Sequence, residues 1–580
     1  MNGNQVGNDS VTGNSYEKVA YTVDKRSKFL LPAVIVSVLL VLITIGLTAA
    51  TLVIVNSRLK ESAITSTPSL NSAYAESVKI TDVMTHLNEF QRIATGANGN
   101  RAINTLGFNQ TLDYITNSLS SHTNFQVQKS FFYLRNFILA GNPILLTSIA
   151  GVVKNRTYST AISSSEFYIA MYSRSANFAD HVAISAIPNV GCDESDWNAA
   201  SPPPTNRVAL VKRGTCSFVE KAAFAVKYNV AALLIYNDGT SADRIPPIFI
   251  SLGEENELPA LFLSYTLGQE LATAAQDPSN NVGVRLIIRF TDESTFPVGN
   301  ICADTPTGDA TQTIVIGSHS DSVPAGPGIN DNGSGSAANL GLAIALARLF
   351  QTSSYEKYKY RIRFCWWGAG EVGLLGSVDH VKNAKVATAI GERLQDYLIN
   401  LNFDMLGSPN YIFGIYDGQT ANDATPAQAL PGSNKISALF RDWFESQKLP
   451  WDFTDFSGRS DYGPFLAEGI VAGGLFSGAD ETKSHEQRKR YEEALGPNMG
   501  GVSGAIQDPC YHKACDSIDN INVFAYEKIV QAAAYAVEYL AKQSDLATWL
   551  YPNGRPTRTS GQSSHRKYNS INEYFGLPYL

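Results

Sequence analysis

Apolar and polar residues follow two different periods in the C-terminal half of the chain, and each period predicts one kind of element. Short apolar runs that stop at Gly or polar residues are typical of buried strands, and these lie at 313–317, 360–367 and 397–403. Apolar residues at helical spacing follow them, at 336–350, from about residue 375, at 435–447 and at 525–542. Strands that alternate with helices predict an α/β fold with a mostly parallel central sheet flanked by helices.

The rest of the folded chain carries two further patterns. Residues 76–134 predict two helices and a strand, at 78–93, 106–119 and 125–133. From about residue 139 to residue 289 the pattern changes to short β-rich runs, with strands at 208–212 and 231–236 and a helix at 218–228. This middle segment has no cluster of His and carboxylate residues, so we expect it to have a structural or binding role.

A long apolar run near the N-terminus predicts a membrane anchor. Residues 29–55 carry no charge and are long enough to span a bilayer as one helix. A cleaved signal peptide is the alternative, but its apolar core is only about 7–15 residues long. The flanking charges favour a cytoplasmic tail at 1–28, a stalk at 56–75 and a luminal or extracellular body, in the secretory pathway, a vacuole or at the cell surface. Sequons at Asn109 and Asn155 agree with that side of the membrane.

Composition narrows the class of protein. With 580 residues the chain is long enough for two or three domains. Its 44% hydrophobic and 17% charged residues describe a packed globular protein rather than a disordered one. The formal net charge of −8 gives no reason to expect nucleic acid as a partner.

The six cysteines fall into pairs. Two pairs could be disulfides if the body faces an oxidising compartment, Cys192 with Cys216 and Cys510 with Cys515. Cys302 and Cys365 lie on apolar, strand-like segments. We predict that these two are buried thiols, with a bridge between them as the alternative.

Residues able to bind a metal ion follow the predicted strands. His319 and Asp321 come at the end of the strand at 313–317, and a Gly-rich loop then places Asp331 just before a helix. The other candidates lie in further loops of the same region, namely Glu371, Asp404 and His512. A single Asp in a loop is usually a turn former, but two His and three carboxylates suit two adjacent Zn²⁺ ions. Each ion would take one His and one terminal carboxylate, and both would share the third carboxylate.

Several segments together resemble a known family. The chain is similar to the di-zinc aminopeptidases (metallopeptidase family 28) in the series GSHSDSVPAGPGINDNGSGS, WWGAGEVGLLGS, NFDMLGSPNY, GRSDYGPF, GGLFSGA and DPCYHKACDSIDN. It resembles the protease-associated (PA) domain, often inserted in that family, at VALVKRGTCSFVEKA and AALLIYNDG. The resemblance implies a discontinuous zinc peptidase-like domain at 76–138 and 290–545, a PA domain at 139–289 and a C-terminal tail at 546–580.

The resemblance also implies a role for each candidate residue. The metal ligands it implies are His319, Asp331 and Asp404 for one zinc and Asp331, Glu371 and His512 for the other. Asp321 would orient His319, and Tyr511 would stabilise the oxyanion of a tetrahedral intermediate. The remaining implied features are Arg459 and Phe476 near the substrate pocket and a Cys510–Cys515 bridge that fixes the loop of Tyr511 and His512.

One position departs from the family's pattern. The family has two adjacent glutamates before a GLLGS-like turn, of which the second binds zinc and the first is the general base. Here the second is Glu371, and Gly370 stands in place of the first. A positioned general base contributes about 10²–10⁴-fold to the rate, so full activity would need a substitute such as Asp461 or Glu254.

The sequence therefore predicts a membrane-anchored di-zinc aminopeptidase-like protein that hydrolyses N-terminal residues from peptides, with two Zn²⁺ ions per chain. The alternative is a catalytically impaired zinc-binding protein that acts as a binding or receptor module. The predicted partners are peptide substrates and a membrane, and not nucleic acid.

Overall fold

The computed structural model describes residues 71–556, except 137, 160–161, 215, 217, 241–243, 249, 254–255, 293, 422–424 and 457. The predicted membrane helix at 29–55 therefore lies outside the described residues, as does Glu254. Across the described part of the chain, no helix combines the length and apolar character needed to cross a bilayer. Helix α2 (Ala73–Ser77) overlaps the end of the predicted stalk, and its Tyr74 is fully buried. The packed domain thus begins slightly earlier than the sequence pattern predicts.

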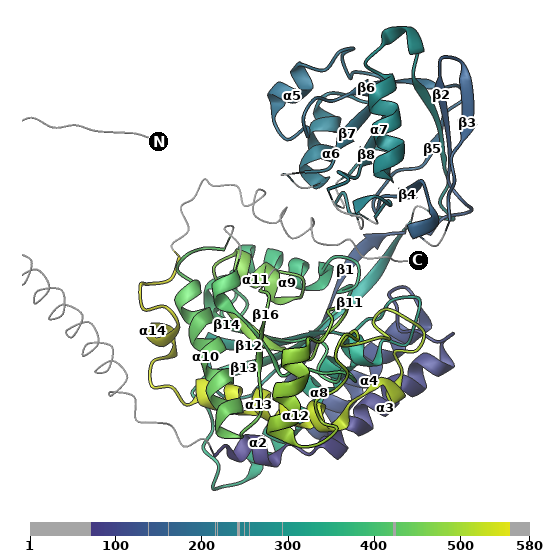
Figure 1. Ribbon diagram of the computed structural model, residues 1–580. Coiled ribbons are helices and arrows are strands. Elements are labelled where there is room, and N and C mark those ends of the chain that lie inside the picture. Colours follow the sequence, from purple (N-terminus) through teal and green to yellow (C-terminus); the bar gives the residue numbers. More distant parts are fainter. Residues whose placement is uncertain are drawn as a thin grey trace, which may run out of the picture. The chain divides into compact units, whose positions relative to one another are not determined.

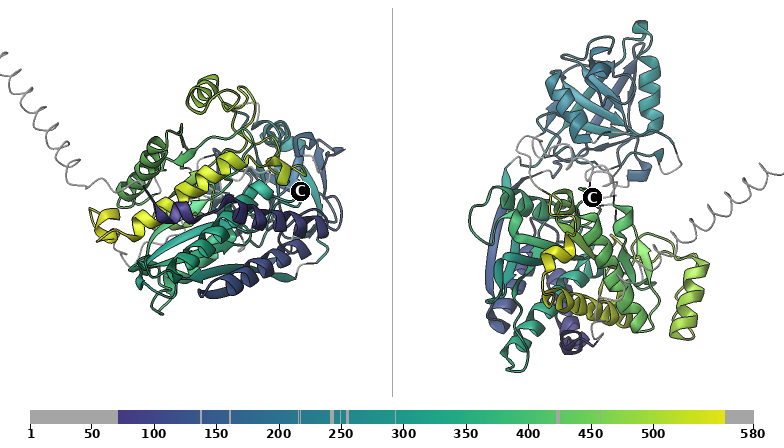
Figure 2. Two further views of the ribbon diagram at one scale, coloured as in Figure 1. Left: turned by 90° about the horizontal axis from the view of Figure 1, so that it is seen from below. Right: turned by 90° about the vertical axis from the view of Figure 1, so that its left-hand side faces the viewer.

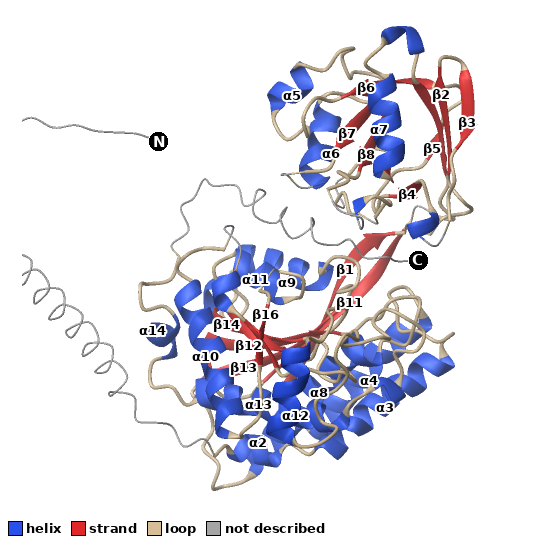
Figure 3. Cartoon of the chain, viewed as in Figure 1, coloured by secondary structure: helices blue, strands red, loops and turns tan. Residues whose placement is uncertain are grey.

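An eight-stranded sheet forms the centre of the larger domain (Figure 1, Figure 3). Its order is β1 (Gln126–Arg135), β11 (Thr295–Asp304), β13 (Tyr360–Trp367), β12 (Asp309–His319), β14 (Tyr397–Phe403), β17 (Val471–Phe476), β15 (Gly414–Tyr416) and β16 (Asp452–Thr454). The central strands β13, β12, β14 and β17 pair in parallel. By contrast, β11 pairs antiparallel with β1 and β13, and β15 does so with β17. The sheet is therefore mixed, with the predicted parallel order at its centre.

The antiparallel edge exists because an inserted segment enters and leaves through neighbouring strands. Strand β1 runs into residues 136–294 and β11 returns from them. The two strands pair along their whole length, from Gln126 opposite Asp304 to Arg135 opposite Thr295. A chain that leaves and returns at one place runs in opposite directions on the two strands.

Helices cover both faces of this sheet, and alternate strand residues show which face each helix covers. Ile362, Phe364 and Trp366 of β13 share a core with α2, α3 (Ile80–Gly96), α4 (Leu106–His122), α8 (Gly335–Gln351), α10 (Leu430–Ser446) and α13 (Val523–Ala541). Cys365 and Trp367 of the same strand pack instead with α9 (Leu375–Val386) and α11 (Tyr462–Ala467). This period of two is what a strand covered on both faces requires.

Segments far apart in the sequence meet in this domain. The N-terminal helices α2 and α3 contact α13, which lies near the other end of the chain (Figure 2). The other described helices of the domain are α12 (His485–Leu495) and α14 (Leu546–Leu550), with short turns at η5 (Leu394–Asp396), η6 (Gly418–Thr420) and η7 (Ile518–Asn520). Leu546 and Leu550 are fully buried, so the packed domain also extends past residue 545.

The inserted segment folds around a second, nine-stranded sheet. Its order is β3 (Val152–Asn155), β2 (Ile144–Ile149), β10 (Gly283–Ile288), β6 (Val182–Ala186), β7 (Val208–Lys212), β8 (Ala232–Tyr236), β9 (Ala260–Leu263) and β4 (Phe167–Ile169), with β5 (Ala176–Asn177) beside β10. Helices α5 (Glu194–Asn198) and α6 (Phe218–Lys227) pack on one face, and α7 (Tyr265–Ala274) packs on the other. The predicted β-rich inserted domain is therefore present.

All six cysteines are paired. The predicted bridges Cys192–Cys216 and Cys510–Cys515 are both present. The prediction of buried thiols at Cys302 and Cys365 was wrong, because these two residues form a third disulfide. They lie directly opposite one another on the neighbouring strands β11 and β13, with Cα atoms 4.1 Å apart.

Candidate metal centre

The carboxyl ends of three neighbouring parallel strands deliver three of the predicted ligands to one edge of the sheet. His319 is the last residue of β12, Asp404 directly follows β14, and Glu371 follows β13 after a short turn. Parallel strands end on the same side of a sheet, and Figure 3 shows β12, β13 and β14 side by side. Residues distant in sequence therefore meet at this edge.

Asp331 and His512 reach the same edge from two loops. Asp331 lies in η4 (Ile329–Ser334), just before α8, and its backbone is non-helical with φ −105° and ψ 100°. His512 lies in the loop that the Cys510–Cys515 disulfide closes, and its φ of 58° is left-handed. Histidine is one of the few residues other than glycine that are enriched in this region.

The two carboxylate oxygens of Asp331 face two different histidines. Its Oδ1 lies 3.3 Å from His319 Nε2, and its Oδ2 lies 2.8 Å from His512 Nε2. Asp404 Oδ1 lies 3.7 Å from His319 Nε2, and Glu371 Oε2 lies 3.5 Å from His512 Nε2. The five side chains form two groups that share Asp331, and the candidate ligand atoms of each group lie within 4.8 Å of one another.

Asp321 connects the His319 strand to the turn that carries Glu371. Its Oδ1 lies 3.4 Å from His319 Nδ1, the ring nitrogen that does not face Asp331. The same carboxylate accepts hydrogen bonds from the backbone N–H of Gly370 at 2.9 Å and of Glu371 at 3.3 Å. One buried carboxylate therefore hydrogen-bonds to the turn of Glu371 and lies beside the His319 ring.

Buried negative charge dominates the electrostatics of the site. Burial opposes the charged form of His319, but Asp404 and the other nearby carboxylates outweigh it and raise the pKa of His319 well above its usual value. Burial likewise opposes charge on His512, but Glu371 and Asp331 raise its pKa to about 9. Burial, followed by the charge of Asp331, raises the pKa of Glu371 to about 7. The site therefore favours positive charge, as protons or as metal ions.

The donor atoms fit a pair of divalent cations. Imidazole nitrogens and carboxylate oxygens are ordinary ligands of Zn²⁺. Glu371 Oε1 and Asp404 Oδ1 are buried and, among the residues that the structure describes, have no hydrogen-bond partner. A buried charged oxygen without a partner is costly unless a cation completes its surroundings. The two groups are thus candidate metal sites on chemical grounds.

The other predicted residues lie beside the two groups or outside them. The ring of Tyr511 stacks on the ring of His512, with centroids 3.5 Å apart. Burial raises the pKa of Tyr511 well above its usual value, which keeps its hydroxyl protonated. Arg459 is exposed in the loop before α11, and Phe476 ends β17 and stacks on Tyr416.

Gly370 lies where the sequence predicts a missing general base, and there is little room for a side chain. A Cβ atom at position 370 would lie 2.4 Å from His319 Cγ. Asp461, one predicted substitute, is fully buried, and the Ser377 hydroxyl donates to its Oδ1 at 2.5 Å. Burial raises the pKa of Asp461 to about 7. Glu254, the other predicted substitute, lies outside the described residues.

Sequence reasoning missed two kinds of residue near the site. The Ser460 hydroxyl donates to Asp404 Oδ2 at 2.5 Å. Arg101 is fully buried and donates to backbone carbonyls in the loop segments after His319 and before Asp331. No pattern distinguishes a supporting Ser or a buried Arg from the many exposed ones, so the sequence offers no signal for either.

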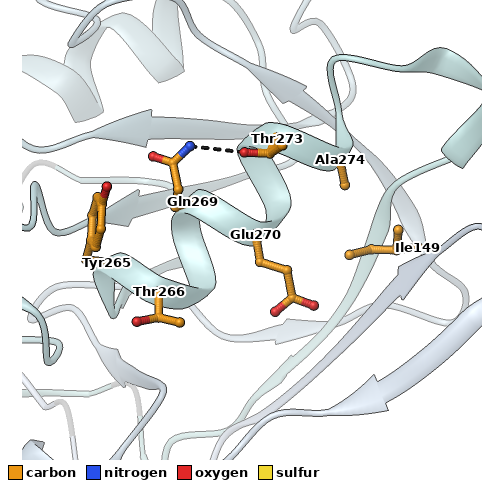
Figure 4. A pocket seen from close by; sticks show the side chains of 7 residues that line it. All are labelled: Ile149, Tyr265, Thr266, Gln269, Glu270, Thr273 and Ala274. Atoms are coloured by element: carbon orange, nitrogen blue, oxygen red, sulfur yellow. Dashed lines mark hydrogen bonds between the residues drawn. The ribbon is translucent and has the colours of Figure 1, made fainter.

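A hollow of about 580 Å³ lies on the inserted domain, along α7 (Figure 4). Gln269, Glu270 and Ile149 are among the residues that line it. Glu270 forms ion pairs with Arg156 at 2.9 Å and Lys154 at 3.1 Å. No candidate metal ligand lines this hollow, so the chemistry is assigned to the sheet edge of the other domain.

Known proteins resemble this chain in sequence and in fold. Residues 300–537 match peptidase family M28, and residues 178–271 match the PA domain. The chain is 32% identical to an aminopeptidase of Pseudomonas aeruginosa (strain UCBPP-PA14) over 472 residues, which are 80% of this chain and 81% of that protein. It is 31% identical to leucine aminopeptidase 2 of Arthroderma otae over 494 residues, which are 84% and 89% of the two chains.

A solved structure shares the fold. The aminopeptidase from Aneurinibacillus sp. strain AM-1 aligns with a TM-score of 0.55 at 19% identity, over 80% of this chain and 94% of that one. The family match spans all five candidate ligands, from His319 to His512. Together with the relatives above, these matches show that the chain belongs to peptidase family M28 and carries a PA domain.

Proposed function

We propose that this protein is a di-zinc aminopeptidase that removes the N-terminal residue from peptides. The observation that carries the proposal is the position of Asp331, whose Oδ1 faces His319 and whose Oδ2 faces His512. One carboxylate between two such groups suits two cations held side by side. Relatives that are 31–32% identical are named aminopeptidases, which supports peptides as the substrate class.

In this proposal the chain's own residues hold the ions and position the reacting groups. The ligands are His319, Asp331 and Asp404 for one Zn²⁺ and Asp331, Glu371 and His512 for the other. When bound, such a pair acidifies water and polarises a carbonyl oxygen. Asp321 fixes the His319 ring through Nδ1, and the protonated hydroxyl of Tyr511 donates to the developing oxyanion. Arg459 and Phe476 contact the substrate.

The proposed mechanism also needs a general base that accepts a proton from the attacking water. Gly370 has no side chain, and a positioned base contributes about 10²–10⁴-fold to the rate, or about 3–5 kcal/mol of barrier. Asp461 is the proposed substitute; it is fully buried, and burial raises its pKa to about 7. Gly370 also favours a second candidate function, a zinc-binding module with little turnover that acts through its PA domain.

We place the folded body on the luminal or extracellular side of a membrane, anchored by residues 29–55. Three disulfides suit an oxidising compartment. Asn109 and Asn155 are both exposed, as glycan acceptors must be. Alkaline extraction of membranes from cells that express the full chain tests the anchor: protein retained with the membranes supports it, and release into the supernatant contradicts it.

The proposed activity is tested with leucine p-nitroanilide, and with N-acetyl-leucine p-nitroanilide as the matched control for a free N-terminus. We expect release only from the unblocked compound, loss of release after chelation, and recovery on adding Zn²⁺. Elemental analysis should find one zinc ion for each of the two groups. Full zinc content without turnover would favour the binding module, and absence of bound zinc would contradict both functions.

A further inference from the structure

Three consecutive backbone N–H groups of the Asp331 loop donate to one residue, Asp516. The Ile329 N–H donates to the Asp516 carbonyl at 3.0 Å. The Asn330 N–H donates to Asp516 Oδ1 at 2.8 Å, and the Asp331 N–H donates to Asp516 Oδ2 at 3.0 Å. Both carboxylate oxygens of Asp516 are therefore engaged by the backbone that carries the shared candidate ligand.

Asp516 also belongs to the loop of His512. It directly follows Cys515, whose disulfide with Cys510 closes the loop around His512. One residue thus joins the backbone of Asp331 to a covalently closed loop, and His512 Nε2 in that loop lies 2.8 Å from Asp331 Oδ2.

The chain holds Asp516 itself in place. Its exposed fraction is 1%, and Asn520 Nδ2 donates to its Oδ1 at 3.3 Å. The same Asn520 amide donates to Asp508 Oδ1 at 2.9 Å, and Asp508 Oδ2 accepts from Asn330 Nδ2 at 2.6 Å. Donors from both loops face the buried carboxyl group of Asp516. The two loops are therefore locked to each other through a buried polar network.

We propose that Asp516 is a positioning residue of the metal centre: it fixes the distance between Asp331 and His512 and thereby sets the cation affinity of the group Asp331–Glu371–His512. The inference rests on the proposed function, because it requires that this group binds a metal ion. The competing explanation is a purely structural role, in which loss of Asp516 lowers stability and leaves metal affinity unchanged.

The test titrates the metal-free full-length protein with Co²⁺ and follows the visible absorbance of each bound equivalent. Wild type should bind one Co²⁺ at each of the two groups. In Asp516→Asn one acceptor oxygen becomes an NH₂ group that faces a backbone N–H. We expect the affinity for one equivalent to fall by about 10–100-fold, the usual effect of losing an outer-sphere partner. The matched control is Glu538→Gln, a buried carboxylate that accepts the Tyr74 N–H and touches no candidate ligand.

Glu538→Gln should lose stability and keep wild-type Co²⁺ binding. Asp516→Asn with unchanged affinity for both equivalents overturns the inference, whatever its thermal midpoint, and so does an equal loss of affinity in the two variants. Wild type that binds no Co²⁺ overturns the proposed function itself. If Asp516→Asn does not fold, Asn520→Ala replaces it, because it removes the amide that donates to Asp516 and Asp508 and leaves both carboxylates in place. We then expect lower affinity for one of the two Co²⁺ equivalents, and unchanged affinity for both overturns the inference.

Discussion

The imidazole of His319 packs directly against the backbone of Gly370. A Cβ atom at position 370 would lie 2.4 Å from Cγ and 2.5 Å from Cβ of His319. These atoms lie at the root of the His319 side chain, so they cannot give way without moving the whole ring. The missing general base and the position of one proposed zinc ligand are therefore coupled.

Because of this contact, we expect that placing a glutamate at position 370 does not restore activity. We expect Gly370→Ala and Gly370→Glu to displace His319, to weaken metal binding by its group about tenfold or more, and not to raise turnover. Gly96→Ala is the matched control, because nothing lies within 4 Å of a Cβ there. Metal content and hydrolysis of leucine p-nitroanilide are measured for all three. A Gly370→Glu variant that keeps its zinc and gains about 10²-fold or more in kcat would show instead that the loop adapts.

Arg101 should be among the most sensitive positions for folding. It is fully buried, and its guanidinium donates to the carbonyls of Pro327 at 2.9 Å and of Ser320 and Gly328 at 2.5 Å each. Arg101→Met leaves the carbonyls of Pro327 and Ser320 without that donor, at about 1–3 kcal/mol each, whereas the Gly328 carbonyl keeps the Gly333 N–H. We therefore expect the free energy of unfolding to fall by at least about 2 kcal/mol.

Urea denaturation measures this effect. The control is Arg92→Met, which removes an exposed ion pair with Glu89 on α3. An exposed pair of this kind is worth about 0.5 kcal/mol or less. Similar losses in the two variants would mean that the carbonyls of Pro327 and Ser320 find other donors.

The pH dependence of stability should report on His380. Its ring lies 4.9 Å from that of Trp367 and stacks on that of Tyr397 at 5.5 Å. Burial, reinforced by Arg363 and Arg361, lowers the pKa of His380 to about 3. In the unfolded chain His380 has a pKa of about 6.5. Below that pH the unfolded state binds a proton that the folded state does not bind until about pH 3. The folded state therefore loses stability as the pH falls from about 6.5.

We expect the thermal midpoint of wild type to fall more between pH 6.5 and pH 5 than that of His380→Phe, which keeps an aromatic ring and cannot take up a proton. Differential scanning calorimetry at matched ionic strength measures both proteins. Parallel pH profiles would show that His380 is not excluded from protonation in the folded state.

The three disulfides differ in the length of chain that they close, and their removal should differ accordingly. Cys302–Cys365 spans 63 residues, for which loop-closure entropy gives about 4 kcal/mol. Cys510–Cys515 spans 5 residues, for which the same relation gives about 2 kcal/mol. We expect the double alanine variant of the first pair to lose more stability in urea and that of the second to lose more metal affinity. The reverse order would contradict both assignments.

The sequence identifies the candidate metal ligands better than it identifies the residues that support them. His319 and Asp404 are identifiable because each follows an apolar run that predicts a buried strand, and parallel strand ends meet at one edge. Cys302 and Cys365 could not be paired in advance, because strand register is set by cross-strand packing and by the course of the inserted domain. Asp516 was not predicted, because most donors to its carboxylate are backbone N–H groups, which every residue but proline possesses.

The sharing of Asp331 predicts how zinc content responds to each ligand. Glu371→Ala and Asp404→Ala should each lose one ion, and Asp331→Ala should lose both, because each affected ion would keep fewer than three protein ligands. Elemental analysis after dialysis gives the zinc content of each variant. A bound ion at 100 times its Kd adds about 2.7 kcal/mol of stability, so a chelator should lower the thermal midpoint most in wild type and least in Asp331→Ala. Asp452→Asn, an acidic residue outside both groups, is the control. Loss of both ions from Glu371→Ala with one retained by Asp331→Ala would mean that another residue bridges the pair.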